Sequence, residues 1–521
     1  MKTTKKLLAM ALAAAMVVTA FAGCSGNNDT SSADSTSSAS SEASTSSDAS
    51  TSDESSATED DGTIHPMRIV QPGTLCPDYE TGMAAVNEKL KEDGVNIEVS
   101  VTRIPWDAYA EKLNLMLTTG EEFELLHVMQ DVKNLSAIAG MGAISSIHDS
   151  IQNYPDLYNK FSETEWLGTL YKGEEYAVPC YWRSFDNTMS YMDYRSDIAE
   201  KVGYDEFPDT TEGIIDLMKK SQDEILNETG MKAYSWFHQV QDTAHWLHRS
   251  YDTYPFYVEN SLGICLIRQD GTVDSFYESE EFKKDANTYY EMYQAGLIDP
   301  DILNRDHQKQ YDDANYGAML PSQTFDPYTG VTMQKNGVEG AEVKWVEAFG
   351  DDIPDMIYTY VQNLNAISST SEDPESGLKF LNWLYASEEN HDLFHYGIEG
   401  THYTKTGDHR IEQVKGDDGN PLYSMDTWMT GYLPYMAYAT DTPDEQVDYM
   451  TYKSDNYVIS PAAGFIFDSS NVTSELTNLQ TEIISSIYPI KVGMVSYEDN
   501  IDAAIAVSYT HLRAHETDSY L

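Results

Sequence analysis

Aromatic residues are abundant in this chain, which has eight Trp and 37 Tyr among 521 residues. Sugar rings have apolar faces that stack on aromatic rings, while their hydroxyl groups need fixed polar partners, so a carbohydrate site combines both residue types. The stretches 179–187 (PCYWRSFDN), 236–239 and 245–249 have this combination. They supply the candidate ligand-binding residues Tyr181, Trp182, Arg183, Trp236 and Trp246.

Trp182 is the leading candidate among these aromatics. Arg183 and Asp186 beside it indicate an exposed polar site. Packing in a core remains the commoner fate of an aromatic side chain, so each of these residues has that alternative. Trp383 lies in the apolar stripe of a predicted helix and is interpreted as a core residue.

Residue patterns for metal binding and catalysis are weak. His245 with His248, and His391 with His395, have helical spacing, but neither pair has the HExxH pattern or an evident third ligand. The chain has no GxSxG, phosphate-loop or GxGxxG motif. A glycosidase needs a pair of carboxylates, but in a chain with 86 acidic residues the presence of such a pair does not indicate an enzyme. Glu399 could face a cleft or cap a loop. We therefore expect no catalytic residue, no metal and no cofactor.

The stretch 107–129, DAYAEKLNLMLTTGEEFELLHVM, predicts the elements that position a site. Its apolar residues recur at helical spacing, and Gly120 is suited to end the helix. Residues 125–129 then read as a short buried strand, and 95–102 as a strand before the helix. The result is a strand–helix–strand unit of a parallel α/β sheet with a right-handed crossover. The apolar positions of the helix are Tyr109, Leu113, Met116 and Leu117.

Ligands of such sheets bind outside the carboxyl ends of the strands. Those ends are Arg103–Trp106 and Gln130–Asn134, which adds Trp106, Gln130 and Asp131 to the candidate ligand-binding residues.

Further elements follow from the same periodicities and turn residues. A hairpin is predicted over 170–179, with its turn at Lys172-Gly173. The segment that begins at Phe207, FPDTTEGIIDLMKKSQDEI, predicts a helix whose N-terminus is capped by Thr210 or Thr211. Strands are predicted at 67–70, 188–194, 316–320 and 356–364. Helices are predicted at 78–91, 135–143, 282–294, 376–385 and 388–396.

The start of the chain predicts export. Three lysines precede an apolar run, 7–22, that is interrupted by Thr19, as in a secretory signal over 1–23. Cys24 follows Ala-Gly, which resembles the bacterial lipobox, so we expect Cys24 to be acylated; ordinary cleavage is the alternative. Residues 24–62 are predicted to be a disordered tether rich in Ser, Thr and Asp. The protein is then anchored at the outer face of a bacterial membrane, and we expect a Gram-positive one.

Length and charge limit the remaining possibilities. Residues 63–506 are long for one domain, so two lobes are expected. The net charge of −54 disfavours a nucleic-acid partner. Cys76, Cys180 and Cys265 give an odd count and are expected to be free thiols. Residues 507–521 begin with VSYTHLRAHET, which a sequencing adapter can encode, and we expect the natural chain to break near Ala506.

Five motifs in chain order resemble family 1 extracellular solute-binding proteins of ABC importers. They are YAEKLNLMLTTGEEFELLHV, KGEEYAVP, EMYQAGLIDPD, FLNWLYASEENHDLFHYGIEGTHY and SPAAGFIFDSSNVTSELTNL. The family pattern has Asp where this chain has Glu124. The last two motifs resemble a large-lobed subset of the family whose C-terminal domain, of unknown function, would begin at 455–506.

This resemblance implies a two-lobe, type II periplasmic-binding-protein-like α/β fold. Lobe 1 would be 63–179 and lobe 2 would be 180–315, each with later segments. It also implies a monomer that captures a small solute, a carbohydrate or oligosaccharide, in an interlobe cleft and delivers it to the transmembrane subunits of an ABC permease. A peptide or other non-sugar solute, or a secreted anchored glycoside hydrolase, are the alternatives that the residues leave open.

Overall fold

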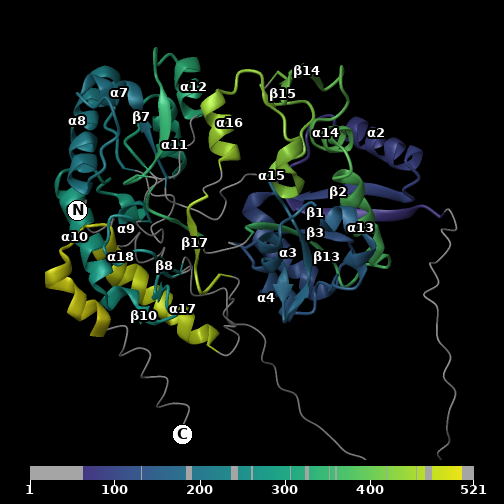
Figure 1. Ribbon diagram of the computed structural model, residues 1–521, viewed down its shortest axis with the longest axis horizontal. Helices are drawn as coiled ribbons and strands as arrows, with labels where there is room; N and C mark the ends of the chain where they lie inside the picture. Colours follow the sequence, from purple (N-terminus) through teal and green to yellow (C-terminus); the bar gives the residue numbers. More distant parts are fainter. Residues whose placement is uncertain are drawn as a thin grey trace, which may run out of the picture. The chain divides into compact units, whose positions relative to one another are not determined.

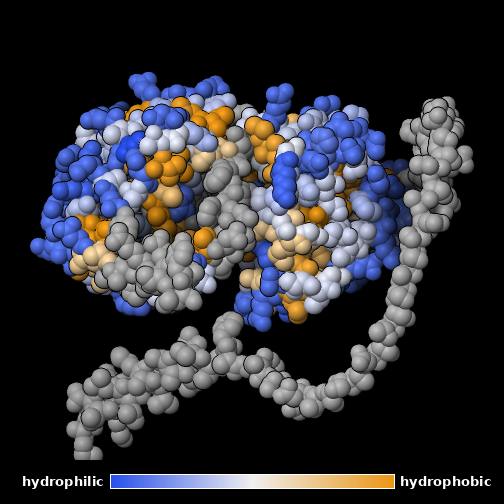
Figure 2. Space-filling view, turned by 90° about the horizontal axis from the view of Figure 1, so that it is seen from below, coloured by the Kyte–Doolittle hydropathy of each residue, from blue (hydrophilic) through white to orange (hydrophobic). Residues whose placement is uncertain are grey.

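The computed structural model describes most of the chain after the predicted tether. The described residues are 63–130, 132–182, 191–235, 245–259, 262–304, 307–322, 328–350, 352–357, 361–417, 419–452, 455–463 and 472–506. They fall in one compact unit, Gly62–Leu521. Hydrophilic side chains cover much of the face shown in Figure 2, in keeping with the excess of acidic residues. No helix of the described ranges is both long and apolar enough to cross a bilayer.

The central element is a five-stranded sheet in the order β2-β1-β3-β13-β6. Strands β1 and β2 pair in parallel, as do β1 and β3, whereas β13 is antiparallel to both of its neighbours. Helix α3 connects β2 to β3, so the predicted parallel strand–helix–strand unit is confirmed, with β1 between its two strands. The bounds are β1 His65–Pro72, β2 Ile97–Ile104, β3 Leu125–Met129, β6 Ala177–Pro179, β13 Asn363–Ile367 and α3 Trp106–Thr119.

Helices cover both faces of this sheet (Figure 1), which explains why all five residues of β3 are buried. One face packs Met67 and Ile69 against α2 and α13. The other face packs Val70 and Leu126 against α3 and α4. Helix α3 buries Tyr109, Leu113 and Met116, as predicted, and ends at Gly120, which is left-handed with φ 67°. The helices are α2 Tyr79–Glu92, α4 Leu135–Gly140, α13 Pro374–Leu384 and α14 Glu388–Tyr396.

A separate hydrophobic core forms from residues between Met192 and Ala348 together with Ile483 to Ala504. Thr210 caps the start of helix α8, and its side chain accepts a hydrogen bond from the Gly213 amide, so the predicted cap is confirmed. The elements of this part are β7 Tyr191–Arg195, α7 Ser196–Lys201, α8 Thr211–Thr229, α9 His245–His248, β8 Phe256–Val258, β9 Cys265–Arg268, β10 Val273–Ser275, α10 Glu280–Gln294, α11 His307–Asn315, α12 Tyr328–Lys335, β11 Val343–Glu347, α17 Thr473–Glu482 and α18 Tyr488–Lys491.

Short elements complete the described chain. The hairpin predicted over 170–179 is confirmed at its turn, as β4–β5, with both turn residues at positive φ (Lys172 54°, Gly173 90°). Its second strand is shorter than predicted, because residues 177–179 form β6 and pair with β13 instead. The remaining bounds are β4 Leu170–Tyr171, β5 Glu174–Glu175, α5 Pro155–Tyr158, α6 Glu163–Leu167, β12 Asp355–Ile357, β14 Tyr403–Gly407, β15 Arg410–Gln413, α15 Thr427–Thr430, β16 Tyr438–Ala439, α16 Asp444–Thr451 and β17 Tyr457–Ile459.

Three sequence predictions need correction. The strand at 316–320 is wrong: Gly317 has φ 97°, and the Ala318 amide bonds back to the Asp313 carbonyl, so this apolar segment is buried without a strand ladder. The strand at 356–364 divides into β12 and the start of β13, with 358–360 outside the described residues. The helix at 135–143 ends at Gly140. The predicted strand at 188–194 is described only from Tyr191, where β7 begins.

Buried histidines make stability depend on pH. Burial lowers the pKa of His127, His391 and His395 to about 3. In the unfolded chain these histidines take up protons as the pH falls through about 6.5, whereas in the folded chain they stay neutral until about pH 3. The free energy of unfolding is therefore highest above pH 6.5 and decreases as the pH falls from 6.5 toward 3. At pH 5 each buried histidine lowers the free energy of unfolding by about 2 kcal/mol relative to neutral pH.

We therefore expect urea unfolding to show decreasing stability from pH 7 to pH 5. His391→Gln isolates one contribution, because a glutamine oxygen can still accept the hydrogen bond that the Tyr432 amide donates to His391. The free energy of unfolding of the variant should decrease less steeply with falling pH than that of the wild type, because unfolding of the variant takes up one proton fewer. Parallel curves for the variant and the wild type would contradict this prediction.

Candidate functional site

Two tryptophans stack at the carboxyl edge of the five-stranded sheet. Trp106 is the first residue of α3, two positions after the end of β2, and it is 56% exposed. Its ring lies 6.0 Å from the ring of Trp428 in α15, at an interplanar angle of 22°. Trp428 is half-buried and packs against the core under α3. We call Trp106 and Trp428 the aromatic platform.

The platform depends on contacts that hold α15 against the sheet. Arg103, at the end of β2, donates from Nη1 to Asp426 Oδ2 (2.8 Å) and to the Pro72 carbonyl (2.9 Å). Its side chain is only 3% exposed, whereas that of Asp426 is 50% exposed. Asn365 on β13 donates from Nδ2 to the Met429 carbonyl at 3.0 Å. Strand ends and α15 therefore fix the platform together, and the half-exposed Asp426 carboxylate lies two residues before Trp428 in the chain.

The segment after β6 is attached to the end of α15. The Tyr181 amide donates to the Gly431 carbonyl, and the Leu433 amide donates to the Tyr181 carbonyl. The Tyr181 ring lies 6.3 Å from that of Tyr432. Trp182 follows directly and is half-buried. The structure thus connects Tyr181 and Trp182 to the same helix that carries Trp428.

Other predicted site residues have different surroundings. Gln130 is half-buried, and its Oε1 accepts a hydrogen bond from the Leu135 amide, which positions the start of α4. Glu399 lies in the exposed turn between α14 and β14. Asp131, Arg183 and Trp236 lie outside the described residues.

Trp246, predicted from the sequence to bind the ligand, is a core residue. It is 5% exposed, stacks on Phe349 (6.2 Å, 7°) and donates from Nε1 to the Tyr289 hydroxyl at 3.3 Å. Its polar neighbours are buried as well: His248 bonds to Asp285 at 2.8 Å, and Arg249 forms ion pairs with two carboxylates, those of Glu347 and Asp355. This ring belongs to the core and cannot stack on a ligand.

Trp428 and Asp426 are not among the site residues predicted from the sequence. The Arg103–Asp426 contact joins residues 323 positions apart, so no local spacing could reveal it. The local composition could have indicated this site. The segment MDTWMTGYLPY places Trp428 among polar residues, as the residues around Trp182 do.

The paired histidines have structural partners. His395 Nδ1 and Nε2 lie within hydrogen-bond distance of the Met425 and Thr430 carbonyls, at 2.7 and 3.2 Å. His248 is bonded to Asp285. Across the described residues, no group of three or more His, Cys, Asp or Glu side chains is arranged to hold a metal ion.

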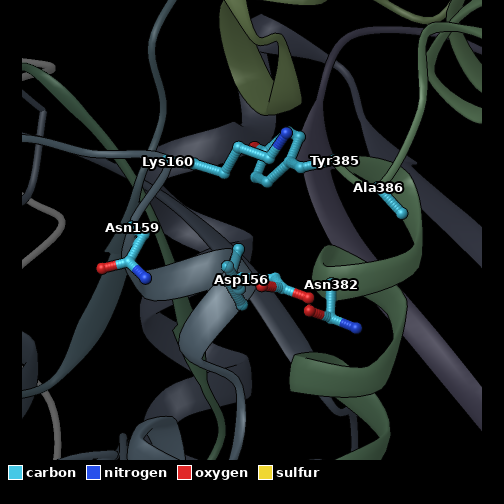
Figure 3. A pocket seen from close by; sticks show the side chains of 7 residues that line it. Asp156, Asn159, Lys160, Asn382, Tyr385 and Ala386 are labelled. Carbon is cyan, nitrogen blue, oxygen red and sulfur yellow. The ribbon is translucent and has the colours of Figure 1, made fainter.

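A separate cavity of about 380 Å³ lies between α5 and the end of α13 (Figure 3). Lys160 at its edge donates to the Tyr435 hydroxyl at 2.9 Å and lies over the Tyr435 ring. Tyr385 is fully buried, so the cavity lacks the exposed ring face that the platform provides. The lining residues are Asp156, Leu157, Asn159, Lys160, Asn382, Tyr385 and Ala386.

A helix-covered sheet with an aromatic site at its carboxyl edge, together with a second α/β core, defines a two-lobe α/β ligand-binding protein. The model of the bacterial extracellular solute-binding proteins matches residues 77–391, more than half of the chain. The chain therefore belongs to this family, as its motifs indicate.

Known proteins are similar over most of the chain. A carbohydrate ABC transporter substrate-binding protein of Streptococcus pneumoniae serotype 4 (strain ATCC BAA-334 / TIGR4) is 23% identical over 433 residues, covering 80% of this chain and 82% of that protein. The N-glycan transport solute binding protein NgtS from Streptococcus pneumoniae is 18% identical, with TM-score 0.67, covering 86% of this chain and 95% of that one. An extracellular solute-binding protein from Bifidobacterium longum subsp. infantis is 15% identical, with TM-score 0.59, covering 86% and 95%. These structures share the fold.

The Arg103–Asp426 pair predicts a stability effect. Asp426→Asn leaves the buried guanidinium without its carboxylate, and we expect a loss of about 1–3 kcal/mol, toward the lower end because Asp426 is half exposed. Urea unfolding measures the loss. Asp444→Asn is the matched control, because Asp444 pairs with Arg410 through a carboxylate that is 95% exposed. Equal effects of the two substitutions would contradict the assigned importance of the Arg103 contact.

Proposed function

We propose that this protein is a lipid-anchored extracellular solute-binding protein that captures a carbohydrate, including oligosaccharides, and delivers it to an ABC permease. The exposed, stacked platform, with the half-exposed Asp426 two residues before Trp428, is the observation that carries the carbohydrate assignment. An indole face accepts the apolar face of a sugar ring, and the carboxylate accepts hydrogen bonds from hydroxyl groups. The similar proteins of Streptococcus pneumoniae, a carbohydrate ABC transporter substrate-binding protein and an N-glycan transport solute binding protein, support the same assignment.

The proposed ligand site combines the platform with residues from the sequence analysis. Trp106 and Trp428 supply stacking, and Asp426 accepts hydrogen bonds. Tyr181 and Trp182 extend the site along the segment attached to α15. Gln130, Asp131, Arg183, Trp236 and Glu399 remain proposed ligand contacts from the sequence alone.

Capture follows from a change in population between open and closed arrangements of the two lobes. A ligand that touches both lobes only in the closed state shifts the equilibrium toward closure, by as much as its affinities for the two states differ. The permease then receives the closed, loaded form. The function requires no bond to be broken in the solute, and we assign no catalytic residue or cofactor.

The N-terminal segments complete the proposal. Residues 1–23 act as the lipoprotein signal peptide, and Cys24 carries the lipid. Residues 24–62 tether the binding domain, 63–506, outside the membrane. Two or more acyl chains suffice to hold such a protein at a membrane surface.

A thermal-shift screen of the mature protein tests the ligand class, because a ligand that binds only the folded state raises the melting temperature with its concentration. Mono- and oligosaccharides, peptides and polyamines are the probes. We expect a sugar to give the largest shift. A shift from a peptide or polyamine alone would overturn the carbohydrate assignment and leave the transport role in place. Turnover of a chromogenic glycoside would instead indicate an enzyme.

Trp106→Ala tests the platform. Loss of the stacking face should weaken binding of the sugar found in the screen about tenfold or more, measured by calorimetry. Leu115→Ala is the matched control, because Leu115 lies on the same helix and is 60% exposed. The platform assignment fails if Trp106→Ala and Leu115→Ala bind equally well.

A further inference from the structure

We infer that His127 is a positioning residue for the ligand site: it fixes the orientation of Trp428 and, through it, the geometry of the aromatic platform. The inference rests on the proposed function for its effect on affinity, but its geometry stands independently.

His127 lies in the middle of β3 with 0% exposure, directly under α15. Its ring centroid is 5.1 Å from that of Trp428, and the two planes are nearly perpendicular at 79°. Trp428 is therefore held between two rings, with Trp106 stacked on it and His127 meeting it edge-to-face. Such perpendicular contacts are a favoured geometry for aromatic pairs and restrict rotation of the indole.

The contacts form a closed circuit around the site. Trp106 contacts Trp428, and Trp428 contacts His127. The His127 carbonyl accepts a hydrogen bond from the Tyr109 hydroxyl at 3.3 Å, and the Tyr109 ring lies 5.9 Å from that of Trp106. A displacement at His127 therefore reaches the exposed Trp106 by two routes, one through Trp428 and one through Tyr109.

A histidine suits this position because its surroundings are both aromatic and polar. Asn365 is its partner in the β3–β13 ladder, and the side chains of Asn363 and Asn365 face the imidazole. Asn365 in turn donates to the Met429 carbonyl of α15. Burial lowers the pKa of His127 to about 3, so the ring is neutral at pH 7 and brings no charge under the platform. Neither ring nitrogen of His127 has a hydrogen-bond partner among the described residues. The edge-to-face contact with Trp428 is therefore the interaction through which the imidazole acts on α15.

A purely structural role makes a different prediction from a positioning role. If His127 only filled the core, its replacement would lower stability and leave the platform unchanged in the folded fraction. If His127 orients Trp428, the coupling between the two indoles changes in protein that is fully folded. Near-ultraviolet circular dichroism detects this coupling, and the difference between wild type and Trp106→Ala isolates the platform signal.

The test compares His127→Leu with Ile138→Val in the full mature protein. Ile138 is fully buried in the core against which Trp428 packs, but it belongs to α4 and makes none of the four contacts of the circuit, so its substitution costs stability without altering the circuit. We expect His127→Leu to lose most of the platform signal and to bind the screened sugar about three- to thirtyfold more weakly, whereas Ile138→Val keeps both. A wild-type signal and affinity in folded His127→Leu would overturn the inference.

A milder variant keeps the test decisive if His127→Leu fails to fold. Tyr109→Phe removes only the hydroxyl that bonds to the His127 carbonyl. It should shift the platform signal in the same direction by a smaller amount, and an unchanged signal would count against the inference. The circular dichroism result needs no ligand, so failure of the carbohydrate assignment and failure of the positioning role are separately visible.

Discussion

The contact between Arg103 and Asp426 is the constraint on which the candidate site depends. It joins the end of β2 to a segment 323 positions later in the chain, and the guanidinium is almost completely buried while the carboxylate reaches the surface. A buried guanidinium must keep its hydrogen-bond partners, because the cost of an unpaired interior charge is several kcal/mol. The position of α15, and of Trp428 on it, is therefore set by an electrostatic requirement at the sheet edge rather than by the preference of a four-residue helix.

The same principle organises the second core. Arg249 is buried and pairs with Glu347 and Asp355, which lie at the end of β11 and the start of β12. Those strand ends belong to the stretch that leads from the second core to β13 of the five-stranded sheet. In both cores a buried arginine thus holds segments that are distant in sequence, and the apolar packing that surrounds it excludes the water that would otherwise compete for its hydrogen bonds.

Local signals predicted most of the helices and strands that flank the site. Helix periodicity and a left-handed glycine located α3, and a short apolar run located β3, because each depends on neighbouring residues alone. The partner of Trp106 could not be predicted, because its contact with Trp428 exists only after the chain has folded. Trp246 was misinterpreted for a physical reason: His248 and Arg249 look like surface residues in sequence, yet both are buried with acidic partners. Polar neighbours indicate exposure only when the interior offers them no counter-charge.

The sheet order has a consequence for how the chain is made. Strand β13, which lies between β3 and β6, comes from residues 363–367, and the second core takes in residues as late as Ala504. Neither core can close on a ribosome that has made only the first three hundred residues. The complete fold therefore waits for late segments of the chain, and an incompletely folded chain is the state that a translocation channel accepts. For an extracellular protein, this order of synthesis favours export before the fold is complete.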